Sequence, residues 1–466
     1  MPKPLAAIIS LGCSKNQVDS RIMATQLIRM GYALTADQSM ASLIVVNTCG
    51  FLQRAVEESV DIILEASRWK QEGSCSRLVV AGCMVQRYGR KLPALLPEVD
   101  CFLGTAHIHR LNEVFCEGAE GLDGSPVLIS RPREILEEFG SCRVSDGSPA
   151  SVYLRIADGC NNRCSFCMIP RLRGPLRSRP VPAILEEAER LVQGGAVEIN
   201  LIAQDITAFE SERGVGRALI TLLEGLESLE GLQWIRLLYA YPGGITDDLL
   251  ACIRDSERIV PYLDIPLQHC VPHILRGMRG RPSLVEPKAL VDRIRSAIPD
   301  MVLRTTLMVG FPGESERDFE TLLSFVRDTR FDHLGVFAFS PEPGTRAARL
   351  PSQIPESERE ERRNELLAAQ AEISRALLAR QVGKSLPALV EGYHPETDLL
   401  LTGRLKSQAP EVDGAVLITA GMAVVDRIIP VRITKSHTYD LEAEVLSEEE
   451  GISGPRLPQS SGIKTL

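Results

Sequence analysis

Short apolar runs alternate with longer amphipathic stretches over the first hundred residues of the chain. The strand-like runs lie at 5–11, 43–47, 78–81 and 101–104. Helical periodicity is found at 18–30, at 53–69 and after Gln86. Alternation of this kind predicts a parallel sheet with helices packed on both of its faces.

The same alternation starts again at residue 152. Strand-like runs begin near Val152, Val197, Trp234, Tyr262, Val302 and Leu334, and a helical pattern follows each of them. Six such units predict an α/β open (β/α)6 partial barrel, with an active site at the carboxyl ends of its strands. A charged helix rich in Ala and Leu is expected over 356–380.

The pattern changes after residue 383, where short apolar runs are separated by Gly and Pro. The runs are 386–391, 399–404, 415–418, 424–425 and 431–435. Five small strands predict a small all-β barrel of the oligonucleotide-binding (OB-like) kind.

These patterns predict five segments along the chain. They are a parallel-sheet domain at 1–116, a linker at 117–150 with a short helix at 133–139, the partial barrel at 151–382, the small barrel at 383–446, and a disordered tail at 447–466. The linker and the tail are rich in Gly, Ser, Pro and charge, a composition typical of loops and disorder.

The net charge of the chain limits the kinds of macromolecule that it is expected to bind. The 466 residues carry a net charge of −9, which argues against broad nucleic-acid binding because phosphate affinity depends on Lys and Arg. Residues 383–446 hold six Lys and Arg against nine Asp and Glu, a net of −3. Such a barrel suits a basic protein partner better than RNA.

Neither a membrane span nor a signal peptide is indicated by the hydropathy of the chain. Twelve cysteines in a chain of this length, without an export signal, indicate metal-binding or catalytic thiols in a reducing compartment. We therefore expect a cytoplasmic protein with no membrane partner.

Three cysteines form a Cys-x3-Cys-x2-Cys array just after the run that begins at Val152. Cys160, Cys164 and Cys167 are close enough in sequence to converge on one inorganic centre, and thiolates are the usual ligands of iron–sulfur clusters. Three ligands leave one iron of a four-iron cluster open. A structural zinc site is the weaker alternative, because it needs a fourth Cys or His nearby and the next histidine is His269.

A second set of cysteines follows the first three strands. Cys13, Cys49 and Cys83 each come two residues beyond a predicted strand. Since the carboxyl ends of parallel strands meet at one edge of a sheet, these three thiols are expected to lie together there. A lone cysteine is most often a small buried hydrophobe, but three in the same register favour a second iron–sulfur site.

Polar residues also follow the strands of the partial barrel. They are Gln204, Asp205, Tyr239, Gln268, His269 and the turn 310–314. Gln204 is either a cofactor contact or an ordinary hydrogen-bonding residue at a strand end. For Arg304, within the fifth strand, the alternatives are a cofactor carboxylate and a structural Asp or Glu, because a buried arginine without a partner is costly. His269 is expected to be structural.

Four arginines, Arg171, Arg173, Arg177 and Arg179, follow the cysteine array. Two interpretations remain open for them. A guanidinium cluster at the active site would hold an acidic substrate by bidentate pairing, whereas a loop face in water would have no such role.

The whole pattern resembles a known family. The stretches that carry the resemblance are 10–20, 47–51, 81–83, the Cys160 array and 409–414. They resemble the methylthiotransferases, which are radical S-adenosylmethionine enzymes with a cluster domain in front and a TRAM domain behind. Among them, the branch that modifies an aspartate of small-subunit ribosomal protein twelve is most similar.

The resemblance implies two 4Fe-4S clusters, one on Cys13, Cys49 and Cys83 and one on Cys160, Cys164, Cys167 and S-adenosylmethionine. It implies cleavage of S-adenosylmethionine to a 5′-deoxyadenosyl radical, which abstracts hydrogen from the β-carbon of the aspartate, and a methylated sulfur carried by the other cluster. Gln204 and Arg304 are expected to contact the cofactor. A ferredoxin or flavodoxin is expected to supply electrons.

Two other functions stay open. Methylthiolation of an adenosine in transfer RNA shares the same architecture, although the acidic barrel makes this partner less favoured. A non-catalytic iron–sulfur carrier or RNA-binding scaffold is the third hypothesis. It is the least favoured, because a cluster with one open iron is unstable and poorly suited to electron transfer alone.

Overall fold

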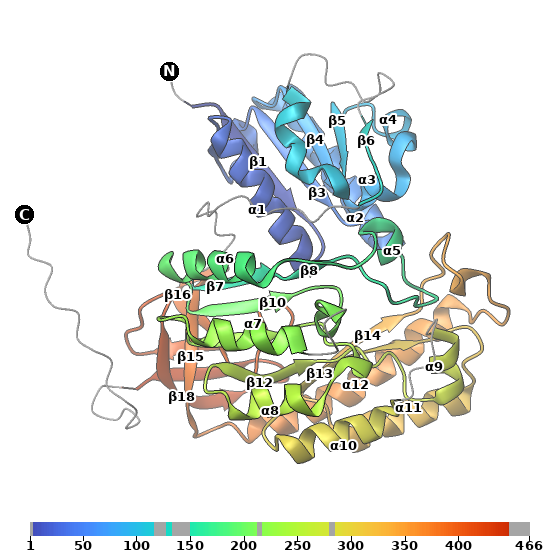
Figure 1. The fold of residues 1–466 in the computed structure, drawn as a ribbon, viewed down its shortest axis with the longest axis vertical. Helices are drawn as coiled ribbons and strands as arrows, with labels where there is room; N and C mark the ends of the chain where they lie inside the picture. The colour runs from blue at the N-terminus through green and yellow to red at the C-terminus, as the bar shows by residue number, and fades with distance from the viewer. Residues whose placement is uncertain (1–2, 116–126, 133–149, 212–216, 279–284, 447–466) are drawn as a thin grey trace, which may run out of the picture. The chain divides into compact units, whose positions relative to one another are not determined.

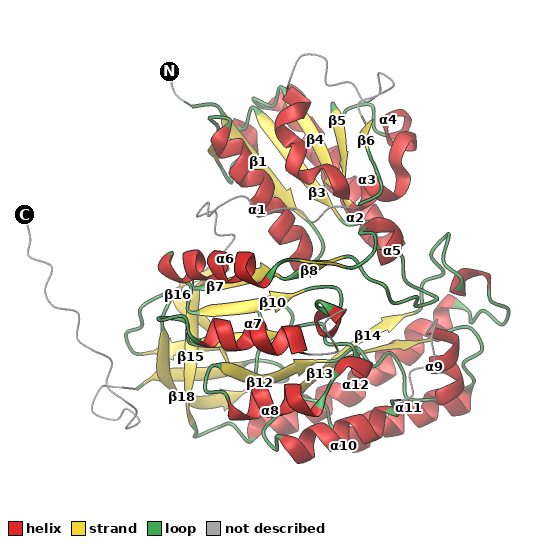
Figure 2. Cartoon of the chain, in the orientation of Figure 1, coloured by secondary structure: helices red, strands yellow, loops and turns green. Residues whose placement is uncertain are grey.

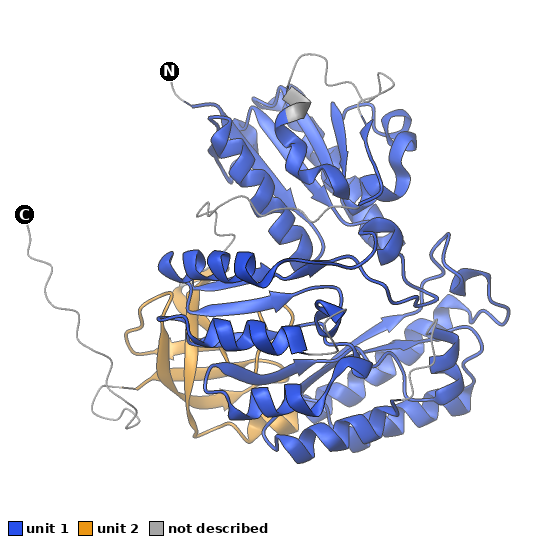
Figure 3. Ribbon diagram, in the orientation of Figure 1, with its two compact units in different colours: residues 1–374 blue, residues 375–466 orange. Residues whose placement is uncertain are grey.

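The computed structural model describes residues 3–115, 127–132, 150–211, 217–278 and 285–446. They form two compact units, divided between Ser374 and Arg375 (Figure 3). The predicted tail and the predicted helix at 133–139 lie outside the described residues, as do two of the twelve cysteines, Cys116 and Cys142. Within the described ranges, no helix has the length and apolar character needed to cross a bilayer.

The first sheet is parallel throughout, as predicted, with strand order β2-β1-β3-β4-β5-β6 (Figure 1). Its strands are β1 (Leu5–Ser10), β2 (Ala33–Leu34), β3 (Leu43–Thr48), β4 (Arg77–Gly82), β5 (Cys101–Gly104) and β6 (Val127–Leu128). The two-residue strands β2 and β6 were not predicted, because two residues are too few to show a period. β6 lies within 117–150, the range interpreted as a linker.

Helices cover both faces of this sheet (Figure 2). The helical segments are α1 (Ser14–Arg29), η1 (Gln38–Met40), α2 (Gln53–Glu72), α3 (Cys83–Tyr88), η2 (Gly89–Lys91), α4 (Leu92–Leu95) and η3 (Thr105–Phe115). Ile44 and Val46 of β3 pack in the same cluster as Ile63 of α2. Asn47 points the opposite way, because alternate residues of a strand face opposite sides, and its amide donates to the Asn16 carbonyl of α1.

The second sheet is an open parallel sheet of order β14-β13-β12-β11-β10-β7, which confirms the predicted partial barrel. Its strands are β7 (Ser151–Arg155), β10 (Glu198–Ile202), β11 (Trp234–Leu237), β12 (Ile259–Asp264), β13 (Val302–Val309) and β14 (His333–Ala338). The longer helices of this region are α6 (Val181–Gln193), α7 (Arg217–Glu227), α8 (Asp247–Asp255), α10 (Pro287–Ala297), α11 (Glu316–Thr329) and the expected charged helix α12 (Glu356–Ala379).

The interior of the partial barrel contains a buried ion pair. Arg236 and Glu198 have no solvent exposure, and Nη2 of Arg236 lies 2.9 Å from Oε1 of Glu198. The guanidinium also stacks 4.8 Å from the ring centroid of Tyr262. Buried charges need such partners.

The second compact unit contains the predicted small barrel, closed in the order β15-β16-β17-β19-β18. Its strands are β15 (Ser385–His394), β16 (Thr397–Leu405), β17 (Val416–Ala420), β18 (Ile428–Ser436) and β19 (Leu441–Val445). The predicted strand at Val424–Val425 was wrong, because those residues lie in a loop in which Asp426 adopts φ +67°. β19 was missed because its alternate positions are Glu442 and Glu444, so it contains no apolar run.

Candidate functional site

The first three cysteines lie at the carboxyl edge of the first sheet. Cys13 precedes α1 and follows the end of β1, Cys49 comes directly after β3, and Cys83 comes directly after β4 as the first residue of α3. Cys13 is exposed, Cys49 is partly buried and Cys83 is buried. The strand topology therefore brings to one edge three thiols that are about 35 residues apart in sequence.

Close backbone contacts hold these loops together. A Cβ atom added to Gly12, which has φ +95°, would lie 2.9 Å from Cβ of Cys49 and 3.2 Å from its Sγ. Asn16 of α1 lies beside the third thiol, with Oδ1 4.0 Å from Sγ of Cys83. Burial raises the pKa of Cys83 to about 12, and the neighbouring thiols Cys13 and Cys49 add to this shift. The electrostatic coupling places all three thiols in one neighbourhood.

The second three cysteines lie in a loop that follows β7. A two-stranded ribbon, β8 (Ala157–Asp158) paired with β9 (Arg177–Ser178), closes the base of this loop. Gly159 sits at the turn with φ +78°, and an added Cβ would lie 2.0 Å from the carbonyl oxygen of Pro175. Only glycine fits this close approach, so the ribbon fixes where the cysteine loop begins.

Within this loop, backbone donors point at two of the sulfurs. The N–H groups of Asn162 and Ile169 donate to Sγ of Cys160 and Cys167, each over 3.4 Å. Burial raises the pKa of Cys167 to about 12, and the thiols Cys164 and Cys160 contribute to the shift. Thiols with such pKa values are neutral near pH 7 unless a bound metal ion displaces the proton.

The two triads were also compared with sites for a single metal ion. Among the described residues, no group of three or more His, Cys, Asp or Glu is arranged around one ion position. In a four-iron cluster each protein thiolate binds a different iron, so the sulfurs lie farther apart than the ligands of one zinc ion.

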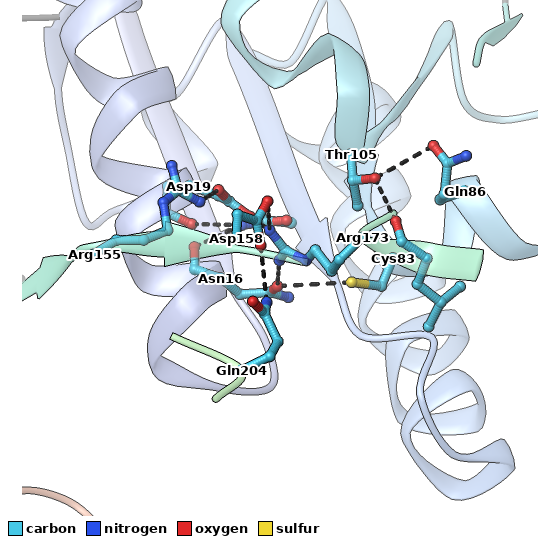
Figure 4. Close-up of polar contacts among 12 residues, drawn as sticks. Asn16, Asp19, Cys83, Gln86, Thr105, Arg155, Asp158, Arg173 and Gln204 are labelled. Carbon is cyan, nitrogen blue, oxygen red and sulfur yellow. Dashed lines mark hydrogen bonds and ion pairs between the residues drawn. The ribbon is translucent and has the colours of Figure 1, made fainter. Parts of the chain in front are cut away.

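A buried cluster of charges connects the two triads (Figure 4). Asp19 of α1 forms ion pairs with two arginines of the central domain: Nη1 of Arg155 lies 2.6 Å from Oδ1, and Nη1 of Arg173 lies 2.6 Å from Oδ2. Arg173 also donates to Oδ1 of Asn16 over 2.6 Å. Its guanidinium lies 3.8 Å from Asp158, which stands two residues before Cys160. Arg173 therefore touches elements that carry both sets of thiols.

Three arginines determine the ionisation of Asp158. Burial acts to raise the pKa of Asp158. The positive charges of Arg173, Arg155 and Arg177 outweigh this effect and hold the pKa below its ordinary value. Asp158 is thus a carboxylate at neutral pH, and this charge compensates the buried guanidinium groups around it.

A lysine beside the first triad reaches the mouth of the partial barrel. Nζ of Lys15 lies 2.8 Å from the ring centroid of Tyr239, the residue two positions beyond β11. Oγ of the neighbouring Ser14 lies 3.3 Å from the Tyr239 hydroxyl. Burial lowers the pKa of Lys15 to about 7.

The two predicted cofactor contacts lie in different surroundings. Nε2 of Gln204 donates to Oδ1 of Asp158 over 2.8 Å, so this side chain is close to the base of the Cys160 loop. Arg304 lies in β13, where its Nε is 3.8 Å from Oδ1 of Asp264. Gln204 follows the carboxyl end of β10, whereas Arg304 is the third residue of β13, and both already have carboxylate neighbours.

The four arginines after the cysteine array do not form a single group. Three of them neither face water nor are free to bind an acidic substrate, because acidic residues of the chain already pair with them. Arg173, Arg177 and Arg179 are largely buried and paired with acidic residues, Arg177 with Asp158 and Arg179 with Glu187. Arg171 is exposed. The expected structural role of His269 is consistent with its full burial, with Nε2 3.4 Å from Glu314.

The polar face of α1 was not predicted to belong to the site. Asn16, Asp19 and Ser20 are all buried, and Asp19 and Ser20 follow Asn16 by three and four residues, a spacing that places them beside Asn16 on one side of a helix. Polar residues at that spacing, directly after a cysteine, are a signal that was available in the sequence.

Comparison with known families matches three segments of the chain. Residues 6–104 match the model described as "Uncharacterized protein family UPF0004", residues 154–326 match the Radical SAM superfamily, and residues 382–446 match the TRAM domain.

Curated relatives match almost the whole chain. A "Ribosomal protein uS12 methylthiotransferase RimO" from Syntrophobacter fumaroxidans is 57% identical over 442 residues, covering 95% of this chain and 98% of the relative. A protein of the same name from Syntrophotalea carbinolica is 46% identical over 448 residues, covering 96% and 98%. Among solved structures, the radical S-adenosylmethionine methyltransferase TsrM from Kitasatospora setae has a TM-score of 0.53 at 13% identity, covering 72% of this chain and 75% of TsrM, a likeness of fold.

Proposed function

This chain belongs to the ribosomal protein uS12 methylthiotransferase family, and we propose that it adds a methylthio group to the β-carbon of an aspartate in small-subunit ribosomal protein twelve (uS12). The observation that carries the proposal is the presence of two separate thiol triads in one compact unit, one at the carboxyl edge of each parallel sheet. A carrier of electrons needs only fully ligated clusters, whereas two centres with three thiols each suit two different chemical tasks.

The donor sets fit two iron–sulfur clusters. We propose that Cys13, Cys49 and Cys83 hold one 4Fe-4S cluster and that Cys160, Cys164 and Cys167 hold the other. The N–H groups directed at Cys160 and Cys167 support the second assignment, because hydrogen bonds to sulfur are a usual feature of protein-bound clusters. When bound, the two clusters supply one-electron reduction of S-adenosylmethionine and delivery of sulfur.

The chain itself positions these groups. The β8–β9 ribbon anchors the Cys160 loop, while Asp19 and Arg173 keep the front sheet against it. We propose that Gln204 contacts S-adenosylmethionine, because it lies at the base of this loop. The assignment of Arg304 to the cofactor carboxylate remains a proposal too, since Asp264 is a competing partner.

Reduction requires an external electron donor of low potential. We propose a ferredoxin or a flavodoxin, because the proposed chemistry begins with transfer of one electron to a cluster.

The proposal is tested with the full-length chain, reconstituted with iron and sulfide under anaerobic, reducing conditions. Incubation with S-adenosylmethionine and uS12, or a peptide from its loop, is expected to increase the substrate mass by a methylthio group in place of hydrogen. Fragmentation of the product is expected to place the group on an aspartate. Absence of this mass change, together with loss of a methylthiolated nucleoside from transfer RNA in a deletion strain, would support the transfer-RNA function instead.

Gly12 provides a sharper test of the first triad. Gly12→Ala places a Cβ 2.9 Å from Cβ of Cys49, which is closer than side-chain carbons pack, so Cys49 must shift. We expect the reconstituted variant to lose most of the iron attributed to the first triad, while 5′-deoxyadenosine formation persists. Iron analysis and chromatography of the reaction products measure the two effects.

Gly31→Ala is the matched control for this substitution. Gly31 has φ +93°, almost the same as Gly12, but an added Cβ would meet nothing within 4 Å. Both variants therefore carry similar backbone strain, about 1 kcal/mol, and only Gly12→Ala disturbs a cysteine. Equal iron loss in the two variants would mean that strain, and not the contact with Cys49, is responsible.

A further inference from the structure

Lys15 has a buried amino group that forms no ion pair with a carboxylate of the described residues. Its side chain is only 5% exposed, and no carboxylate among the described residues lies within ion-pair distance of its Nζ. Burying an ammonium group in this way is costly, because the lost hydration is not replaced by a counter-ion. Such a cost suggests that the partner is supplied from outside the chain.

The ammonium group is nevertheless held in a defined place. The ring of Tyr239 lies 2.8 Å from Nζ, and a cation over an aromatic face is attracted to it. Tyr239 adopts φ +65°, a strained conformation for a residue with a side chain, and its N–H donates to Asp264. Strain of this kind is concentrated at functional sites, where the surrounding structure maintains it.

The acidic residues nearest to Lys15 are already engaged. Asp264 accepts from the Tyr239 backbone and lies 3.8 Å from Arg304. Asp158 accepts from Gln204 and pairs with Arg177. Both carboxylates, like the Cys13 thiol, act on the charge of Lys15 from a distance, and neither is within ion-pair distance of its Nζ.

From these observations we infer that Lys15 binds the side-chain carboxylate of the substrate aspartate. The inference rests on the proposed function, in which sulfur is added to the β-carbon, the atom bonded directly to that carboxyl group. Lys15 stands two residues from Cys13, so a carboxylate on its Nζ would present the β-carbon beside the first triad. The aromatic ring of Tyr239 covers one side of the ammonium group and fixes the position of Nζ.

A different role would be to balance the charge of a cluster held by Cys13. The two roles predict different results when the charge of Lys15 is removed. A counter-charge to the cluster is needed to retain iron, whereas a carboxylate-binding residue is needed only to distinguish aspartate from a neutral side chain.

The test uses the reconstituted full chain and two uS12 loop peptides, one with the target aspartate and one with asparagine in its place. Wild type is expected to bind the aspartyl peptide at least about tenfold more tightly, since a hydrogen bond to a charged group has about this effect on affinity. Lys15→Met, of similar length but neutral, is expected to bind both peptides equally. Its iron content and its unfolding temperature are expected to match or exceed those of wild type, because a costly buried charge is removed.

Lys91→Met is the control, because Lys91 is exposed in the same domain and the substitution is identical. It is expected to keep the tenfold preference. Lys15→Gln, neutral but polar, is the second variant if Lys15→Met does not fold, and the same loss of preference is expected.

Two results would overturn the inference alone: a retained preference for the aspartyl peptide in the Lys15 variants, or loss of about half of their iron. In both cases wild type would still form the methylthiolated product. Wild type that forms no product would overturn the proposed function and this inference with it.

Discussion

Replacing Cys160, Cys164 and Cys167 together with alanine is expected to halve the iron of the reconstituted chain, from about eight to about four per molecule, because each cubane contains four irons. Formation of 5′-deoxyadenosine is expected to stop completely, since these thiols are proposed to hold the cluster that reduces S-adenosylmethionine. Iron and sulfide analysis, with chromatography of the nucleoside, measures both effects.

The same replacement at Cys13, Cys49 and Cys83 separates the roles of the two triads. It is expected to remove a similar amount of iron but to leave 5′-deoxyadenosine formation in place, while no methylthiolated product is formed. Cys75, Cys101 and Cys252 lie outside both triads and supply the matched control, a triple alanine variant that is expected to keep about eight irons. An equal loss of nucleoside formation in both triad variants would contradict the division of tasks.

Arg173→Met is expected to destabilise the first compact unit by about 3–5 kcal/mol. The substitution leaves Asp19, which has no solvent exposure, with one arginine in place of two, and it removes the donor to Asn16. Removing one member of a buried ion pair is costly because the remaining charge loses its compensation. Denaturant unfolding followed by fluorescence measures the change, since both tryptophans, Trp69 and Trp234, lie in this unit.

Arg171→Met is the control for this prediction, because Arg171 lies two residues away in the same loop and is exposed. Its effect is expected to be below about 0.5 kcal/mol. The loss of unfolding free energy in Arg173→Lys is expected to lie between those of Arg173→Met and Arg171→Met. Lysine keeps the positive charge, but its ammonium group lacks the planar guanidinium geometry that contacts Asn16 and Asp19 together. Equal unfolding free energies for Arg173→Met and Arg171→Met would show that the charge cluster contributes little to stability.

Hydrophobic periodicity was enough to predict most of the fold. Buried parallel strands appear as continuous apolar runs, and β3 and β4 are of this kind, with five or six buried residues each. Periodicity failed where an element was too short, as in β6, or where one face of a strand was acidic, as in β19. In the second case a strict alternation of apolar and charged residues was the correct signal.

The candidate site could be predicted only in part, for a physical reason. The register of Cys13, Cys49 and Cys83 follows from strand order, which a sequence with βα alternation nearly determines. The partners of Arg173 cannot be read from the sequence around it, because Asp19 is over 150 residues away, on helix α1 of the front domain. Charged residues look alike in sequence whether they lie in water or in a buried pair.

The junction around Asp19 also limits how such a chain can be rearranged. A front domain transplanted from another protein would bring its own residues opposite Arg155 and Arg173, and both buried guanidinium groups would then lose the carboxylate of Asp19. Recombination at the segment between the two sheets therefore succeeds only if the incoming domain carries an acidic side chain at the equivalent turn of its first helix. The front domain and the central domain therefore cannot be exchanged independently of each other.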